Sequence, residues 1–122
     1  MSTTSHSLVG KTALVTGGSR SIGAAIAASL YTLTKGAISG FNRSLVRDLG
    51  PRGITVNTVH PGPTDTDMNP DGGPVSKIVG PGMAIGRYGK AHEIASVVAF
   101  LASPDAAFVT GADIVADGGF TA

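Results

Sequence analysis

Residues Tyr31–Met68 read YTLTKGAISGFNRSLVRDLGPRGITVNTVHPGPTDTDM, and this stretch is the best guide to the fold. Within it an apolar residue recurs at every fourth position, which is the spacing of one helix face. Gly50-Pro51 should end that helix. Ile54–Val59 then alternates apolar and polar residues and is rich in β-branched side chains, so it predicts a strand. The apolar helix positions are Leu33, Ala37, Phe41, Leu45 and Leu49.

The residues before Tyr31 continue the helical pattern. Ser21–Leu30 is rich in alanine and places an isoleucine or leucine at every fourth position. Nothing interrupts the pattern before Tyr31, so we predict one continuous helix over residues 21–49. Further upstream, Lys11–Thr16 predicts a buried strand that Gly17-Gly18 ends.

The residues after this stretch predict a loop, a helix and a strand. Residues 60–82 are rich in proline, glycine and aspartate and predict a long loop. An amphipathic pattern predicts a helix over 91–102, and a short apolar run predicts a strand over 112–116. The order strand, helix, strand, loop, helix, strand predicts an α/β fold with a parallel sheet of about three strands.

The composition restricts the possible functions. The 122 residues fit one small domain over 1–122, and 42% hydrophobic residues favour a buried core. A net charge of +1 and the lack of a long apolar run argue against nucleic-acid and membrane partners. Without cysteine, and with histidines far apart, the sequence predicts no metal site. No signal peptide is recognisable, so we expect a cytoplasmic protein.

A glycine-containing turn lies between the first predicted strand and the long helix. It reads Thr16-Gly17-Gly18-Ser19-Arg20-Ser21-Ile22-Gly23. A helix N-terminus offers free N–H groups and a partial positive charge, and glycines let a pyrophosphate approach the backbone. Such a turn can also do no more than join a strand to a helix. Arg20 could contact a ribose 2′-phosphate or could point into solvent.

Tyr31 and Lys35 lie four apart and therefore share one face of the predicted helix. A nearby ammonium favours the phenolate and lowers the pKa of a phenol from about 10. The pair could then exchange a proton with a carbonyl or an alcohol. On spacing alone, an exposed tyrosine beside a solvated lysine is the better explanation of the pair, because Tyr-x-x-x-Lys often arises by chance.

Three segments together resemble the short-chain dehydrogenase/reductase family over residues 8–122. Tyr31–Met68 is similar to the family's catalytic helix, next strand and Pro-Gly loop. Residues 85–122, IGRYGKAHEIASVVAFLASPDAAFVTGADIVADGGFTA, resemble its last helix, last strand and C-terminal turn. The turn at 16–23 resembles the family pattern T-G-x-x-x-G-x-G, with Ser21 where glycine is usual.

The resemblance implies a truncated Rossmann-like sheet with flanking helices, and an NAD(P)-dependent oxidoreductase similar to 3-oxoacyl carrier-protein reductases. Tyr31 would be the general acid/base, and Lys35 would assist it and bind the nicotinamide ribose. Pro61 and Gly62 would shape the nicotinamide pocket, with Thr64 and Thr66 against the carboxamide. The turn would bind NADP or NAD, with Arg20 slightly favouring NADP, through Gly17, Ser19, Arg20, Ser21, Ile22 and Gly23.

The chain departs from the family between the turn and the tyrosine. Only seven residues separate Gly23 from Tyr31, where the family has a long stretch with an Asn-Ala-Gly strand and the catalytic serine. An adenosine-binding strand end is missing as well. We therefore expect weak cofactor binding and little or no activity. The alternative to an enzyme for alcohol and ketone groups is a non-catalytic remnant that binds nucleotide weakly or associates with intact relatives.

The family comparison also predicts association. In complete relatives the tyrosine helix packs at a subunit interface against a helix that this chain lacks. Leu33, Ala37, Phe41 and Leu45 would then form an exposed apolar stripe, and large exposed apolar patches drive association. We expect a homo-oligomer or an aggregation-prone chain.

Overall fold

The computed structural model describes residues 26–122, and these belong to two compact units. The first contains residues 26–58 and 102–112, and the second contains 59–101 and 113–122. The predicted strand at 12–16, the glycine turn and the predicted helix start at 21–25 lie outside the described residues.

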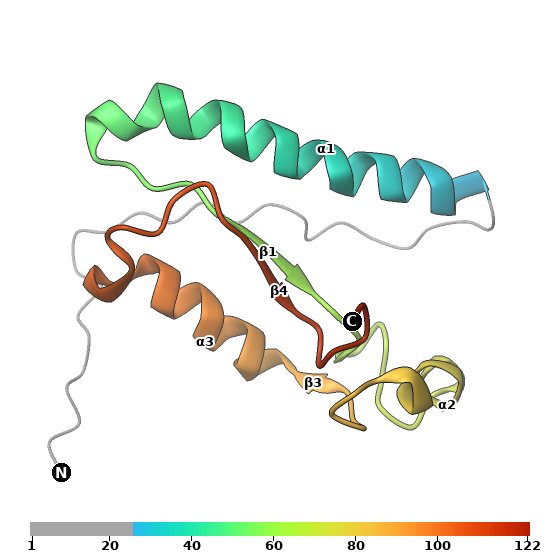
Figure 1. Ribbon diagram of the computed structural model, residues 1–122. Coiled ribbons are helices and arrows are strands. Elements are labelled where there is room, and N and C mark those ends of the chain that lie inside the picture. The colour runs from blue at the N-terminus through green and yellow to red at the C-terminus, as the bar shows by residue number, and fades with distance from the viewer. Residues whose placement is uncertain (1–25) are drawn as a thin grey trace, which may run out of the picture. The chain divides into compact units, whose positions relative to one another are not determined.

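The first unit is dominated by the helix α1, Ile26–Leu49, drawn from blue to green in Figure 1. It runs without a break through Leu30 and Tyr31, which confirms the predicted continuity over this range. A single 3₁₀ turn, Gly50–Arg52, follows α1, and Gly53 closes it in a left-handed conformation with φ of 71°. The predicted stop at Gly50-Pro51 is therefore confirmed.

Polar side chains hold the segment after α1 against residues 109–112. Val56 N–H donates to Thr110 Oγ1 over 3.1 Å, and Asn57 Nδ2 donates to the Val109 carbonyl over 2.9 Å. Asn57 Oδ1 also accepts the Ala112 N–H at 3.1 Å. Only one backbone bond joins residues 54–57 to 109–112, from the Gly111 N–H to the Val56 carbonyl at 2.7 Å, and side chains make the others. The prediction of a strand over 54–59 was therefore wrong at its start. The strand begins at Thr58.

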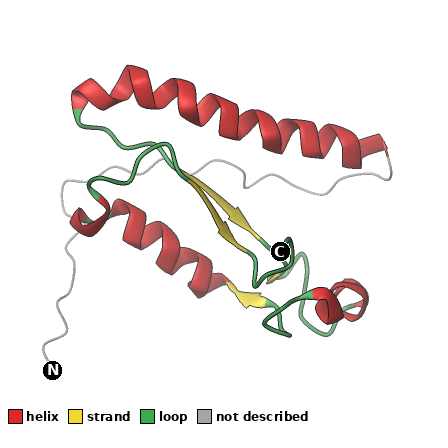
Figure 2. Cartoon of the chain, in the orientation of Figure 1, coloured by secondary structure: helices red, strands yellow, loops and turns green. Residues whose placement is uncertain are grey.

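Two pairs of short strands are present among residues 26–122 (Figure 2). β1, Thr58–Pro61, pairs with β4, Asp113–Ala116. The bonds Thr58 N–H to Ala112 O, at 2.9 Å, and Gly62 N–H to Ala116 O, at 3.0 Å, advance in the same direction along both strands, so the pair is parallel. The α/β class and the strand near 112–116 are confirmed.

The long loop predicted over 60–82 contains more regular structure than expected. β2, Thr64–Asp65, pairs in parallel with β3, Gly89–Lys90. α2, Pro74–Val79, is a short helix followed by a 3₁₀ turn over Gly80–Gly82. Apolar periodicity cannot reveal elements this short. Pro74 at the first helical position was the available signal, because proline suits that position.

The helix α3 spans Ala91–Ala102, as predicted. The second unit contains this helix as far as Leu101. The most buried side chains of the second unit are Met83, 5% exposed, and Tyr88, 1% exposed. The Tyr88 hydroxyl has no hydrogen-bond partner among the described residues.

The apolar stripe of α1 is exposed at its largest residues. Leu33 is 66% exposed and Phe41 is 63% exposed. We predict that the wild-type chain forms dimers or larger species at high concentration in light scattering. The double variant Leu33→Glu with Phe41→Glu should be monomeric, while Ser44→Glu, on an exposed position of the same helix, should associate like wild type. A monomeric wild-type chain at high concentration would refute this expectation.

Candidate functional site

The predicted site residues fall into three groups. The glycine turn with Gly17, Ser19, Arg20, Ser21, Ile22 and Gly23 lies outside the described residues. Tyr31 and Lys35 lie on α1 in the first unit. The second unit contains the third group: Pro61 ends β1 and Gly62 follows it, while Thr64 begins β2 and Thr66 follows that strand.

The helix α1 gives Tyr31 and Lys35 a defined spacing. Four residues of an α-helix rise about 6 Å and return to nearly the same face. Because α1 is continuous from Ile26, Tyr31 and Lys35 are about one turn apart along it. The roles of proton donor and ribose ligand remain predictions.

The segment 61–66, here called the Pro-Gly loop, is held by hydrogen bonds at several points. Gly62 N–H donates to the Ala116 carbonyl at 3.0 Å, and Gly89 N–H donates to the Pro63 carbonyl at 2.9 Å. The Thr64 hydroxyl donates to the Gly62 carbonyl at 2.8 Å. Backbone and side-chain bonds therefore fix the path of the loop directly after β1.

Gly62 is required by packing. A Cβ atom at this position would lie 2.4 Å from both the Cα and the Cβ of Asp117, and 2.9 Å from the Asp117 carbonyl oxygen. Carbon atoms without a bond between them do not approach so closely, and backbone atoms cannot move aside cheaply. The Pro-Gly loop can pass the end of β4 only without a side chain at Gly62.

An ion pair links the two short strands β2 and β3. Asp65 accepts the Asp71 N–H at 2.8 Å and the Lys90 ammonium at 3.1 Å. These bonds hold the pKa of Asp65 below its ordinary value, with the Asp71 N–H as the larger cause. Sequence reasoning missed this pair, because its members are far apart in the chain and become neighbours only through the β2–β3 register.

Arg87 and Glu93, which lies in the first turn of α3, form a second, bidentate ion pair. Arg87 Nη1 and Nη2 donate to the two carboxylate oxygens over 2.8 and 2.7 Å, and Lys90 N–H donates to Glu93 Oε2 over 2.7 Å. The Arg87 bonds, followed by the Lys90 N–H, lower the pKa of Glu93 to about 2. Glu93 thereby caps the start of α3, as a glutamate three residues after a cap position commonly does.

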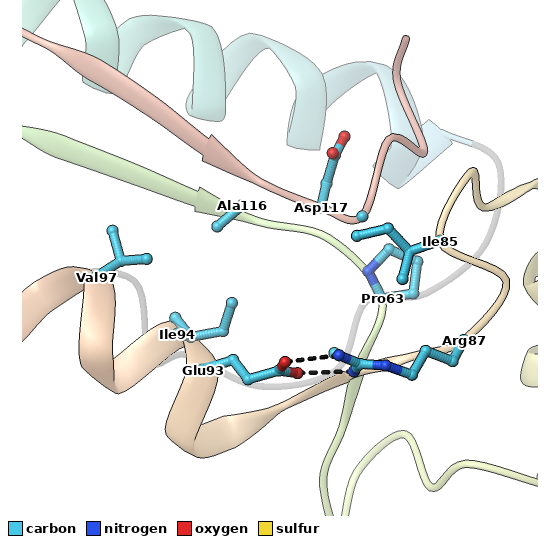
Figure 3. A pocket seen from close by; sticks show the side chains of 10 residues that line it. Pro63, Ile85, Arg87, Glu93, Ile94, Val97, Ala116 and Asp117 are labelled. Carbon is cyan, nitrogen blue, oxygen red and sulfur yellow. Dashed lines mark hydrogen bonds and ion pairs between the residues drawn. The ribbon is translucent and has the colours of Figure 1, made fainter.

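A pocket of about 170 Å³ lies beside these residues (Figure 3). Ile94 and Val97 of α3 point toward Ala116 of β4, and the Arg87–Glu93 pair closes one side. The Asp117 side chain points away from this space in Figure 3. The pocket is smaller than typical sites for drug-sized ligands, which hold roughly 300–1,000 Å³. It has room for one small apolar group and not for a dinucleotide.

The described part of the chain contains no helix long and apolar enough to cross a membrane. Among residues 26–122, no three His, Cys, Asp or Glu side chains gather in a way that could hold a metal ion.

Comparison with known proteins identifies the lineage. The family model described as enoyl-(acyl carrier protein) reductase matches residues 7–121. A curated relative, the cyclic-di-GMP-binding biofilm dispersal mediator protein of Escherichia coli, is 52% identical over 92 residues, which are 75% of this chain and 39% of that protein.

Two solved structures agree with this assignment. A short-chain dehydrogenase/reductase from Serratia marcescens matches with a TM-score of 0.76 at 53% identity, over 79% of this chain and 39% of that one. A blue fluorescent protein from a metagenomic library, solved in complex with NADPH, matches with a TM-score of 0.74 at 52% identity, over 77% of this chain and 38% of that one.

The chain therefore belongs to the short-chain dehydrogenase/reductase family, whose members are NAD(P)-dependent oxidoreductases. It spans about two fifths of the length of the relatives that it matches, such as 39% of the Escherichia coli protein.

The close approach at Gly62 gives a stability prediction. Gly62→Ala should lower the free energy of unfolding by about 1–3 kcal/mol, the usual cost of an overpacked position. Gly80→Ala is the matched control, because φ there is −51° and no atom lies within 4 Å of the added Cβ. It should change stability by less than about 0.5 kcal/mol. Equal urea midpoints for the two variants would contradict the packing argument.

The Arg87–Glu93 pair gives a pH prediction. Because the fold holds the pKa of Glu93 at about 2 instead of the ordinary 4.5, the carboxylate stabilises the fold above about pH 4.5. This contribution is lost as the pH falls from 4.5 toward 2. Between pH 4.5 and 2, the free energy of unfolding of Glu93→Gln should fall less than that of wild type. Urea unfolding at several pH values measures this difference. Asp71→Asn, which removes an exposed carboxylate, is the control, and the prediction fails if both variants keep the wild-type slope.

Proposed function

We propose that this chain carries the proton-transfer pair and the nicotinamide-side loop of an oxidoreductase for alcohol and carbonyl groups, but binds its cofactor weakly and does not turn over substrate by itself. The proposal of a proton-transfer pair rests on the continuous α1 helix, in which Tyr31 and Lys35 are one turn apart. The second half rests on the seven residues that separate Gly23 from Tyr31.

The chemistry of the Pro-Gly loop suits a carboxamide. A carboxamide needs both a donor and an acceptor, and a threonine hydroxyl can be either. Thr64 is half-buried with its hydroxyl on the Gly62 carbonyl, and Thr66 is exposed with its hydroxyl accepting the Asn69 N–H at 3.2 Å. Both hydroxyls can exchange these local bonds for bonds to a ligand.

In a site complete enough to hold the substrate, Tyr31 would donate the proton that the carbonyl oxygen needs as it becomes an alcohol. The ammonium of Lys35, one turn away, favours the phenolate that remains. A bound nicotinamide supplies the hydride. The two residues can do this only if the carbonyl lies within hydrogen-bond reach of the tyrosine.

The proposed loss of activity follows from what should hold the carbonyl. The family's catalytic serine has no counterpart before Tyr31, and the strand end that would hold the adenosine ribose has none either. A misplacement of about 1 Å can cost roughly a hundredfold in rate. We propose NADP as the preferred cofactor, supported by the NADPH complex of the similar blue fluorescent protein and by Arg20.

A second candidate function is association with intact relatives or with copies of itself. It is favoured by the exposure of Leu33 and Phe41 on α1, which leaves an apolar stripe on the helix that bears Tyr31. In this role the chain would be a binding partner and not a catalyst.

The first function is tested with purified protein, NADPH and a panel of 3-oxoacyl and simple ketone substrates. We expect wild type and Tyr31→Phe to oxidise NADPH at the same background rate. Weak NADPH binding should be measurable by titration calorimetry in both proteins.

Two results would overturn this account in different ways. Turnover by wild type at ordinary enzyme rates, about 1–1,000 s⁻¹, and its loss in Tyr31→Phe would show a functional site rebuilt from the remaining residues. No detectable NADPH binding at millimolar concentration would leave the association role as the better proposal.

A further inference from the structure

The C-terminal turn, residues 117–121, lies against the Pro-Gly loop. Gly62 donates its N–H to the Ala116 carbonyl, and the space where a Cβ would stand is taken by the Asp117 backbone and Cβ. The position of Gly62 is therefore set by the position of Asp117.

The carboxylate of Asp117 closes this turn on itself. One oxygen accepts the Gly119 N–H at 2.9 Å, and the other accepts the Thr121 N–H at 3.0 Å and the Thr121 hydroxyl at 2.6 Å. The Thr121 hydroxyl is the main cause that lowers the pKa of Asp117. Asp117 is thus a charged acceptor of three bonds at neutral pH.

The other side of the turn is enclosed as well. Gly118 and Gly119 both have left-handed φ angles, 64° and 75°, and the Gly118 carbonyl accepts the Ile85 N–H at 3.0 Å. A Cβ on Gly119 would lie 2.6 Å from the Cβ of Ala84. The turn is held between residues 84–85 and Gly62. A change in its shape must therefore displace one of these neighbours.

We propose that Asp117 is a positioning residue for the nicotinamide-side site: its carboxylate holds the C-terminal turn in the shape that presses the Asp117 backbone against Gly62, and so fixes the Pro-Gly loop. This inference rests on the proposed function for the role of that loop. Asp117 acts through Gly62 and does not touch the cofactor. Figure 3 shows its side chain directed away from the neighbouring pocket.

The test compares two ligands that differ only at the nicotinamide end. The dissociation constants of NADPH and of 2′-phospho-ADP-ribose, which lacks nicotinamide, are measured for wild type, Asp117→Ala, Asp117→Asn and Thr121→Val. Asp117→Ala should weaken NADPH binding about tenfold, which is about 1.4 kcal/mol of binding free energy, and leave 2′-phospho-ADP-ribose unchanged. Asp117→Asn should restore part of the affinity, and Thr121→Val should lose less than Asp117→Ala.

Amide hydrogen exchange gives a readout that does not depend on cofactor. In Asp117→Ala the Gly62 amide should exchange at least several-fold faster, while the Lys90 amide, bonded to Glu93, stays at the wild-type rate. Asp71→Ala is the matched control, since it removes another aspartate side chain of the same unit from an exposed position. It should change neither readout.

The outcomes separate the two proposals. Wild type that binds neither ligand overturns the proposed function, and the exchange rate of Gly62 then decides the positioning claim alone. Gly62 exchange unchanged by Asp117→Ala overturns the inference even if wild type binds NADPH. Equal weakening of both ligands by Asp117→Ala also overturns it, because it would show a general loss of the fold.

Discussion

The contact between the backbone of Gly62 and that of Asp117 is the constraint on which the second unit depends. Parallel pairing of β1 with β4 brings the ends of both strands to one place, and the chain leaves each strand there in a tight turn. The two turns can share that place only because Gly62 lacks a side chain. The Pro-Gly loop and the C-terminal turn therefore meet at this contact.

The apolar pattern of the sequence predicted the long helices correctly. The short strands were not predicted, for physical reasons. Apolar residues three or four positions apart predicted α1 and α3, because that spacing places them on one helix face. Ile54–Asn57 has the composition of a strand, yet one backbone bond, from Gly111 to Val56, and the side chain of Asn57 join it to its neighbour, so no regular strand forms there. β2 and β3 are two residues each and carry no period.

The residues of the candidate site were also only partly predicted from the sequence. Family resemblance selected Pro61, Gly62, Thr64 and Thr66, and the structure brings these four together in one unit. Asp117 and the Arg87–Glu93 pair were missed, because their importance comes from contacts made after folding. The run Asp117-Gly118-Gly119 was visible as a turn, but nothing in the sequence indicates which loop lies against it.

The central claim is that the Pro-Gly loop keeps its place as the nicotinamide side of a cofactor site in a chain that matches only about two fifths of its relatives' length. The most direct measurement is a residue-assigned amide NMR spectrum recorded during addition of NADPH. The account predicts that the amide chemical shifts of Gly62, Thr64 and Thr66 change most. Because binding is weak, these changes should reach saturation only at high NADPH concentration. Shifts confined to α3, or none in the Pro-Gly loop as the rest of the spectrum saturates, would contradict it.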